Sequence, residues 1–227
     1  DKRVWMKMAE TNAELALQQR TAQQANQQAR LTSLREALDL PDSTERIECF
    51  DISQTMAEVI EYGGKILICG NGGSAADAQH MAAELVGRML VEREALPAIA
   101  LTTDTSNITA ISNDYGYDLV FSRQVEALGK MGDMLIVFST SGNSKNVIYA
   151  IESAHKRGLR TVAVTGGNGG FLADLYKKGK IEFFLCATEG ENSSQIQETH
   201  ISVVHSLVDV MDRFFINNLS NLRKIDY

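Results

Sequence analysis

His80 and Glu84 are the first residues whose types and spacing suggest chemistry. They are four positions apart in a stretch that predicts a helix, so both side chains project from one face. An imidazole and a carboxylate together suit Zn²⁺. The spacing alone is weak evidence, because a surface pair of this kind is more often a simple polar contact.

A second group of polar residues, Gln197, His200 and His205, lies in an apolar stretch that predicts a helix from about residue 194 to 217. Gln197 and His205 are eight positions apart and share a helix face about two turns apart. Their apolar neighbours should be buried, and buried polar groups need hydrogen-bond partners or a metal. Taken alone, His205 is better explained as a core histidine with satisfied hydrogen bonds.

A run of hydroxyl side chains follows one of the apolar segments and precedes a predicted helix: Ser139, Thr140, Ser141 and Ser144. Hydroxyls and backbone amides at a helix N-terminus can bind a phosphate without any lysine. The alternative is that these residues only cap the helix, which is common. Four hydroxyls in six residues exceed what a cap requires, so we favour a phosphate site.

A glycine-rich loop, Gly70-Asn71-Gly72-Gly73-Ser74, also lies between an apolar run and a helix expected from about Ala75. Its glycines allow close approach of a ligand to the backbone, beside the partial positive charge of the helix N-terminus. A tight turn without a ligand is the alternative. The loop lacks the lysine of a P-loop and the spacing of a dinucleotide fingerprint, which disfavours nucleotide chemistry.

Both loops need a scaffold, and the sequence from Lys65 onwards predicts one. Short runs rich in Val and Ile alternate there with helical stretches: KILICG, PAIALT, DMLIVFST, RTVAVTG and IEFFLCA. This alternation predicts an α/β fold with a parallel sheet covered on both faces. Ligands of such sheets bind at the carboxyl ends of the strands, which is where the two loops lie.

The segment before Lys65 differs in character. Residues 1 to about 40 contain no Gly or Pro and predict one long helix with sparse apolar residues, which should pack on a neighbour or another subunit. Residues 41–43 interrupt it. Residues 44–62 predict a second helix, although residues 47–52 could equally form a strand.

Composition limits the functions available. A net charge of −7 argues against binding nucleic acid or an anionic membrane, because both need a basic surface. The widely spaced Cys49, Cys69 and Cys186 are expected to be buried free thiols rather than disulfides. No apolar run approaches the length of a membrane span, and no signal-peptide segment is recognised. We expect a soluble protein of the cytoplasm.

Four ordered motifs, CGNGGSAADAQHMAAELVGR, LTTDTSNITAISNDYGYD, STSGNSKNVI and IQETHISVVH, resemble those of the phosphoheptose isomerases. These enzymes are a branch of the sugar isomerase (SIS) domain family. The resemblance covers about residues 55–217. It implies a three-layer, flavodoxin-like fold with a five-stranded parallel sheet between helices. It also implies a homotetramer whose active sites lie at subunit interfaces.

The resemblance also implies roles for individual residues. One Zn²⁺ per subunit would be held by His80, Glu84, Gln197 and His205. Glu84 and His205 would also be the acid/base pair, although metal ligation and proton transfer compete for the same lone pairs. The substrate would contact Glu84, Gln197 and the hydroxyl-rich loop, together with a set that motif reasoning only partly finds: Asn71, Gly72, Gly73, Ser74, Asn113, Asp114, Ser139, Thr140, Ser141 and Ser144.

The chain departs from this family at two places. Gln195 stands where relatives usually carry Arg, and Ser194 stands where some carry Asp, so a substrate contact is expected to be weaker. Residues 1–53, particularly ERIECFDIS, resemble a segment of a DNA-repair excinuclease and suggest a fusion or a substituted leader. We therefore divide the chain into an N-terminal helical segment (1–54), the SIS domain (55–217) and a C-terminal tail (218–227).

The expected function is isomerisation of sedoheptulose 7-phosphate to D-glycero-D-manno-heptose 7-phosphate through an enediol, a step towards lipopolysaccharide precursors. The main alternative is a non-catalytic SIS tetramer that binds a replication initiator protein, which need not keep the metal ligands. A sugar-binding regulator is a third alternative. Such regulators usually carry a DNA-binding domain, and none is recognised here.

Overall fold

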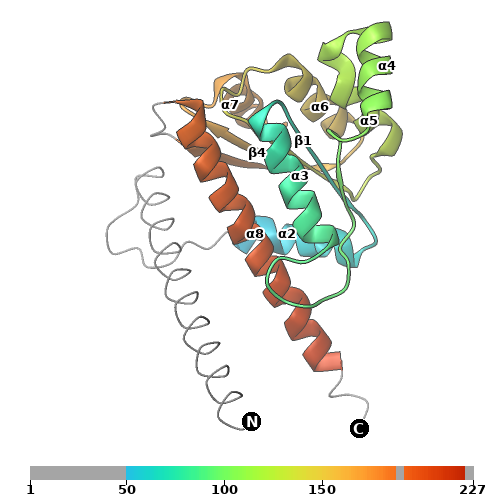
Figure 1. Ribbon diagram of the computed structural model, residues 1–227, viewed down its shortest axis with the longest axis vertical. Helices are drawn as coiled ribbons and strands as arrows, with labels where there is room; N and C mark the ends of the chain where they lie inside the picture. Colours follow the sequence, from blue (N-terminus) through green and yellow to red (C-terminus); the bar gives the residue numbers. More distant parts are fainter. Residues whose placement is uncertain (1–49, 188–191, 223–227) are drawn as a thin grey trace, which may run out of the picture. The chain divides into compact units, whose positions relative to one another are not determined.

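A parallel sheet of five strands, in the order β2-β1-β3-β4-β5, forms the centre of the described structure (Figure 1). This computed structural model describes residues 50–187 and 192–222. The chain divides into two compact units, Asp1–Ile47 and Glu48–Tyr227, and every element described belongs to the second. The strands are β1 (Ile66–Gly70), β2 (Ala98–Ala100), β3 (Met134–Ser139), β4 (Arg160–Gly166) and β5 (Phe183–Ala187).

The strands form where the apolar runs predicted them. Every residue of β1 and β3 is buried, as expected for strands covered on both faces. The pairing is parallel throughout, with Gly70 opposite Phe138 and Ser139 opposite Thr165. The α/β prediction with five parallel strands is therefore confirmed.

Helices cover both faces of the sheet, which gives the predicted three layers. On one face, α5 (Val120–Leu128) and α6 (Lys145–Lys156) pack together, and they share a core with alternate strand residues such as Leu67 and Val137. On the other face, α3 and α8 lie side by side over the sheet, with α2 beneath them (Figure 1). The bounds of the remaining elements are α2 (Phe50–Glu61), α3 (Gly73–Val86), α4 (Thr105–Tyr115), η1 (Tyr117–Leu119), α7 (Gly170–Lys177) and α8 (Ser193–Leu222).

The order of the strands places a crevice at the ends of β1 and β3. The chain passes from β1 to β2 on one side and then returns to form β3 on the other side of β1. The loops leaving β1 and β3 therefore diverge, and ligands of open α/β sheets bind at such a reversal. The glycine-rich loop and the hydroxyl-rich loop are these two loops.

Two predictions about element bounds can be checked. Residues from Phe50 onwards are helical in α2, so the strand alternative does not hold for 50–52. Helix α8 starts at Ser193 and continues to Leu222, past the predicted end near residue 217. The long helix predicted for residues 1–40 and the first part of the predicted second helix lie outside the described residues.

The cysteine prediction needs one correction. Cys69 is a buried free thiol in β1, as predicted, but the free thiol of Cys186 is only half-buried, because β5 lies at the edge of the sheet. Cys49 lies outside the described residues. In the part of the chain that the structure describes, no helix is long and apolar enough to cross a bilayer.

Candidate active site

Helices α3 and α8 run in the same direction, and their contact assembles the site (Figure 1). Gly73, the first residue of α3, lies against the side chain of Gln197 near the start of α8, so that a Cβ at this glycine would be 2.3 Å from the Gln197 Nε2 atom. Further along both helices, His80 meets His205. Any side chain at residue 73 would push the two helices apart at this level.

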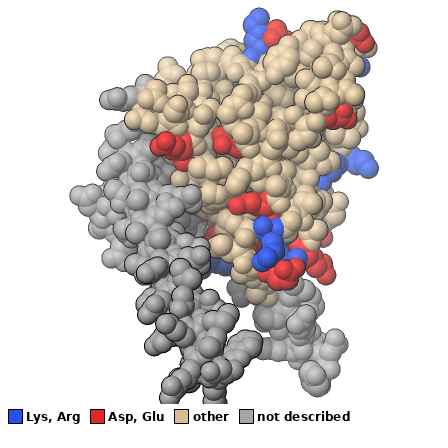
Figure 2. Space-filling model, in the orientation of Figure 1, with Lys and Arg blue, Asp and Glu red and all other residues tan. Residues whose placement is uncertain are grey.

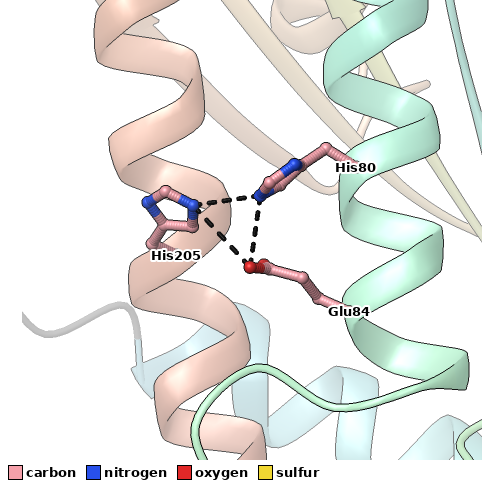
Figure 3. A group of neighbouring side chains, drawn as sticks. All are labelled: His80, Glu84 and His205. Carbon is pink, nitrogen blue, oxygen red and sulfur yellow. Dashed lines mark hydrogen bonds and ion pairs between the residues drawn. The ribbon is translucent and has the colours of Figure 1, made fainter.

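Three side chains from the two helices converge on one point (Figure 3). The His80 Nε2 atom lies 3.1 Å from His205 Nε2 and 3.2 Å from Glu84 Oε1, and His205 Nε2 lies 3.7 Å from the same carboxylate oxygen. Ligand atoms around a tetrahedral Zn²⁺ with bonds of 2.0–2.1 Å are about 3.3 Å apart. The three separations match this spacing.

The cluster is partly open to solvent. The exposed fractions of the side chains rise from 14% for Glu84 through 24% for His205 to 46% for His80. A cation held here would keep a side from which a small molecule can approach, as a catalytic metal requires. The structure thus brings together three of the four metal ligands that the sequence predicted.

Gln197, the fourth predicted ligand, lies on the same face of α8 as His205. The two residues are about 12 Å apart along the helix axis, given a rise of 1.5 Å per residue. The Gln197 amide lies against Gly73, and no hydrogen bond among the described residues joins it to the three-residue cluster. Its role as a metal ligand stays a prediction.

The core histidine with satisfied hydrogen bonds turns out to be His200 rather than His205. His200 is fully buried, its Nε2 lies 3.1 Å from the carbonyl oxygen of Thr165, and its ring lies near Phe138. Burial lowers the pKa of His200, opposed by the hydrogen bond to Thr165. This imidazole is therefore neutral and ties α8 to the end of β4.

Sequence reasoning missed Asp77, which lies on the α3 face that carries His80 and Glu84. It is buried, and its Oδ2 atom has no hydrogen-bond partner among the described residues. Burial raises the pKa of Asp77 to about 6, against the opposing effect of His80. Its spacing of three and seven positions from the two ligands was the signal that could have found it.

The hydroxyl-rich loop starts at the end of β3. Ser139 is buried, and its Oγ atom accepts a hydrogen bond from the backbone N–H of Gly142 at 3.2 Å. Ser141 is exposed, and its Oγ accepts from the N–H of Asn143 at 3.3 Å. Thr140 is half-buried. The hydroxyls thus line the loop in different directions instead of serving a single cap.

Ser144 occupies the N-cap position of α6, but its side chain makes no capping hydrogen bond. The capping alternative therefore does not explain this hydroxyl. Gly142 has a φ of +65°, and a Cβ there would lie 2.0 Å from the carbonyl oxygen of Gly169. The turn before α7 thus presses on the loop and fixes its shape.

The glycine-rich loop is held to α6 by a reciprocal pair of amides. Asn71 Nδ2 donates to Asn146 Oδ1 at 2.9 Å, and Asn146 Nδ2 donates back to Asn71 Oδ1 at 2.8 Å. The Tyr117 hydroxyl also donates to Asn71 Oδ1, at 3.1 Å. Sequence reasoning found Asn71 but not Asn146 or Tyr117, which come from distant parts of the chain.

The remaining predicted residues differ in position. Ser74 is buried in the first turn of α3, and Gly72 has the positive φ of +56° that a glycine accepts without strain. Asn113 and Asp114 are exposed on α4 and bond to each other at 2.8 Å. Among the described residues they make no hydrogen bond to either loop, so their place in the pocket stays a prediction.

Charge over this side of the molecule does not replace the local donors. On the described part of the face in Figure 2, Lys and Arg side chains are scattered and form no continuous basic patch. A phosphate bound near the strand ends would depend on hydroxyls and backbone N–H groups. This agrees with the net charge of −7.

Comparison with known proteins decides the family. A model of the SIS domain matches residues 31–166. The phosphoheptose isomerase of Roseiflexus sp. (strain RS-1) is 54% identical over 162 residues, which cover 71% of this chain and 79% of that protein. The chain belongs to the phosphoheptose isomerase family. The prediction of an isomerase is confirmed with it, and none of these findings favours the initiator-binding alternative.

Other phosphoheptose isomerases agree with this assignment. That of Shewanella denitrificans is 48% identical over 182 residues, covering 80% of this chain and 89% of that protein. The solved phosphoheptose isomerase of Neisseria gonorrhoeae superposes with a TM-score of 0.70 at 44% identity, covering 87% of this chain and 99% of that one. The match to the SIS domain begins before residue 55, while the predicted domain bounds themselves stay a prediction.

Proposed function

We propose that this phosphoheptose isomerase family member converts sedoheptulose 7-phosphate to D-glycero-D-manno-heptose 7-phosphate. The observation that carries the proposal is the convergence of His80, Glu84 and His205 within 4.8 Å of one another, on the two helices that border the loops after β1 and β3. Acid/base groups and an anion-binding loop then serve the same crevice.

The reaction moves a proton between neighbouring carbons. A base removes a proton from C1 of the ketose, the electron pair forms the C1–C2 double bond of an enediol, and the C2 oxygen takes up a proton. Return of a proton to C2 and loss of the O1 proton give the aldehyde. Glu84 and His205 are the groups we assign to these transfers, because general acid/base catalysis needs two titratable groups within reach of adjacent atoms.

The same residues fit a zinc ion. We propose that His80, Glu84 and His205, with Gln197 as fourth ligand, hold one Zn²⁺ per subunit. When bound, the ion would polarise the substrate carbonyl as a Lewis acid. A lone pair of Glu84 or His205 that binds metal cannot accept a proton at the same moment, so one of the two roles yields during turnover.

The phosphate is assigned to Ser139, Thr140, Ser141 and Ser144 and to the N-terminus of α6. The Ser144 hydroxyl supports this role because it is not used for capping. Asn71, held by Asn146 and Tyr117, would orient the sugar hydroxyls between the two loops. Gly72, Gly73 and Ser74 would let the sugar approach the backbone.

Assembly is part of the proposal. Helix α4, which carries Asn113 and Asp114, has no buried residue in the single chain. A homotetramer in which α4 faces the pocket of another subunit would bring these residues to the substrate. We place the enzyme in the cytoplasm, where its phosphorylated substrates would be formed.

The decisive experiment is an assay of the purified protein with sedoheptulose 7-phosphate, with and without added Zn²⁺, together with metal analysis of protein prepared without chelator. We expect formation of the aldose phosphate and stoichiometric zinc. A protein that neither turns over this sugar nor contains zinc, yet forms a stable complex with another protein, would support the non-catalytic alternative.

A further inference from the structure

Arg93 is a buried arginine in the connection between α3 and β2. Its side chain has an exposed fraction of 0%, and that of its partner Asp212 on α8 is 2%. A buried charge needs a strong reason, because both ions lose their hydration on folding. The reason is visible in what the guanidinium contacts.

The Arg93 guanidinium joins the end of α3 to α8. Its Nε donates to Asp212 Oδ1 at 2.5 Å, its Nη2 donates to the carbonyl oxygen of Glu84 at 2.7 Å, and its Nη1 donates to that of Leu85 at 2.9 Å. It therefore caps the last carbonyls of α3, which have no partner within the helix, at the negative end of the helix dipole. One of these carbonyls belongs to Glu84 itself.

Asp212 lies on the α8 face that carries His205, seven positions further along. We infer that Arg93 is a positioning residue, which with Asp212 fixes α3 against α8 so that the Glu84 carboxylate and the His205 imidazole meet. This inference rests on the proposed function of that cluster. Arg93 does not reach the substrate and acts through the backbone of Glu84.

Stability alone does not explain the pair. The Asp212 Oδ2 atom is buried without a hydrogen-bond partner among the described residues, so the carboxylate is only half satisfied. Buried ion pairs with such deficits contribute little net stability, and apolar residues of similar size often replace them without loss. A planar fork with several donors, however, fixes both distance and angle between two helices, which lysine cannot do.

The test compares two identical chemical changes at two buried carboxylates. Asp212→Asn removes the charge opposite Arg93, and Asp133→Asn removes the charge opposite Lys65, in a pair that joins β1 to β3 at the other end of the sheet. Arg93→Lys completes the set. Each variant is measured for melting temperature, for zinc affinity by competition with a chromophoric chelator, and for kcat and KM.

We expect Asp212→Asn and Arg93→Lys to lower zinc affinity and kcat about 10- to 100-fold with KM within about twofold, as changes to residues that orient metal ligands do. Asp133→Asn should lower the melting temperature while zinc affinity and kcat stay at the wild-type values. The inference is overturned if the Arg93 and Asp212 variants affect only melting temperature, as Asp133→Asn does.

A double variant removes the remaining ambiguity from folding. Arg93→Met with Asp212→Leu deletes both charges, so it should melt at a higher temperature than Asp212→Asn while kcat and zinc affinity stay low. Recovery of both by the double variant would show that only folding had been lost, and would contradict a positioning role. If the wild-type protein neither binds zinc nor isomerises the sugar, the proposed function itself fails, and the inference fails with it.

Discussion

His80 Nε2 lies 3.1 Å from His205 Nε2, although 125 positions separate the two residues in the chain. Two imidazole nitrogens at this distance either share a proton or face a common cation. The contact exists because α3 and α8 leave the same edge of the sheet and run in the same direction. Several expected outcomes depend on it.

Glu84→Gln should abolish most of the activity. The amide keeps the shape of the side chain but can neither accept a proton as a base nor offer an anionic ligand. We expect kcat to fall by at least about 100-fold, the range for loss of a general acid/base group. Glu152→Gln is the control, because Glu152 makes only a surface ion pair with Lys180. Equal turnover in the two variants would refute the assignment of Glu84.

Ser144→Ala should separate binding from stability. Since the Ser144 hydroxyl makes no capping hydrogen bond, its loss should change the free energy of unfolding by less than about 0.5 kcal/mol, whereas KM for the phosphorylated sugar should rise several-fold.

The matched control for this test is Asp104→Ala. Asp104 does cap its helix, accepting from the N–H of Asn107 at 3.0 Å, so its loss should cost about 1 kcal/mol of stability. Urea unfolding and steady-state kinetics measure both variants. A Ser144→Ala protein with unchanged KM and a loss of stability like that of Asp104→Ala would restore the capping explanation.

His200 should make the stability depend on pH. Burial lowers its folded-state pKa below the ordinary value of 6.5, so the unfolded state binds the proton more tightly. Its contribution is present above pH 6.5 and is lost as the pH falls below this value. The loss is at most about 1.4 kcal/mol per pH unit.

Chelator-treated wild-type protein and His200→Gln, compared by urea unfolding at several pH values between about 5.5 and 7.5, test this expectation. Glutamine can still donate to the Thr165 carbonyl but does not titrate. The stability of the wild type should fall relative to the variant towards acid pH. Parallel pH curves for the two proteins would contradict it.

Subunit exchange tests the shared active site. Four chains of 24.9 kDa predict a native mass of about 100 kDa by light scattering. If α4 of one subunit serves the cluster of another, Glu84→Gln and Asp114→Asn each inactivate a different half of the site. Co-expression should then give mixed tetramers with more activity than either variant alone. Mixed assemblies as inactive as their parents would place both residues in one subunit.

The residue sequence determined the sheet and the order of its loops. Apolar runs rich in Val and Ile can be buried on both faces only in a parallel sheet, and such strands alternate with helices. The glycine-rich and hydroxyl-rich loops were found because local backbone freedom and helix N-termini dictate their residue types. The four motifs supplied the family, since their order and spacing are properties of the chain alone.

The tertiary structure decided which polar residues meet. On α8, sequence could not separate His200 from His205, because both lie among apolar residues; packing sends the first to the Thr165 carbonyl and the second to His80. Asn146 and Arg93 were invisible for a similar reason. Their partners, Asn71 and Asp212, are distant in sequence, and only the packing of helices on the sheet brings these charges and amides into contact.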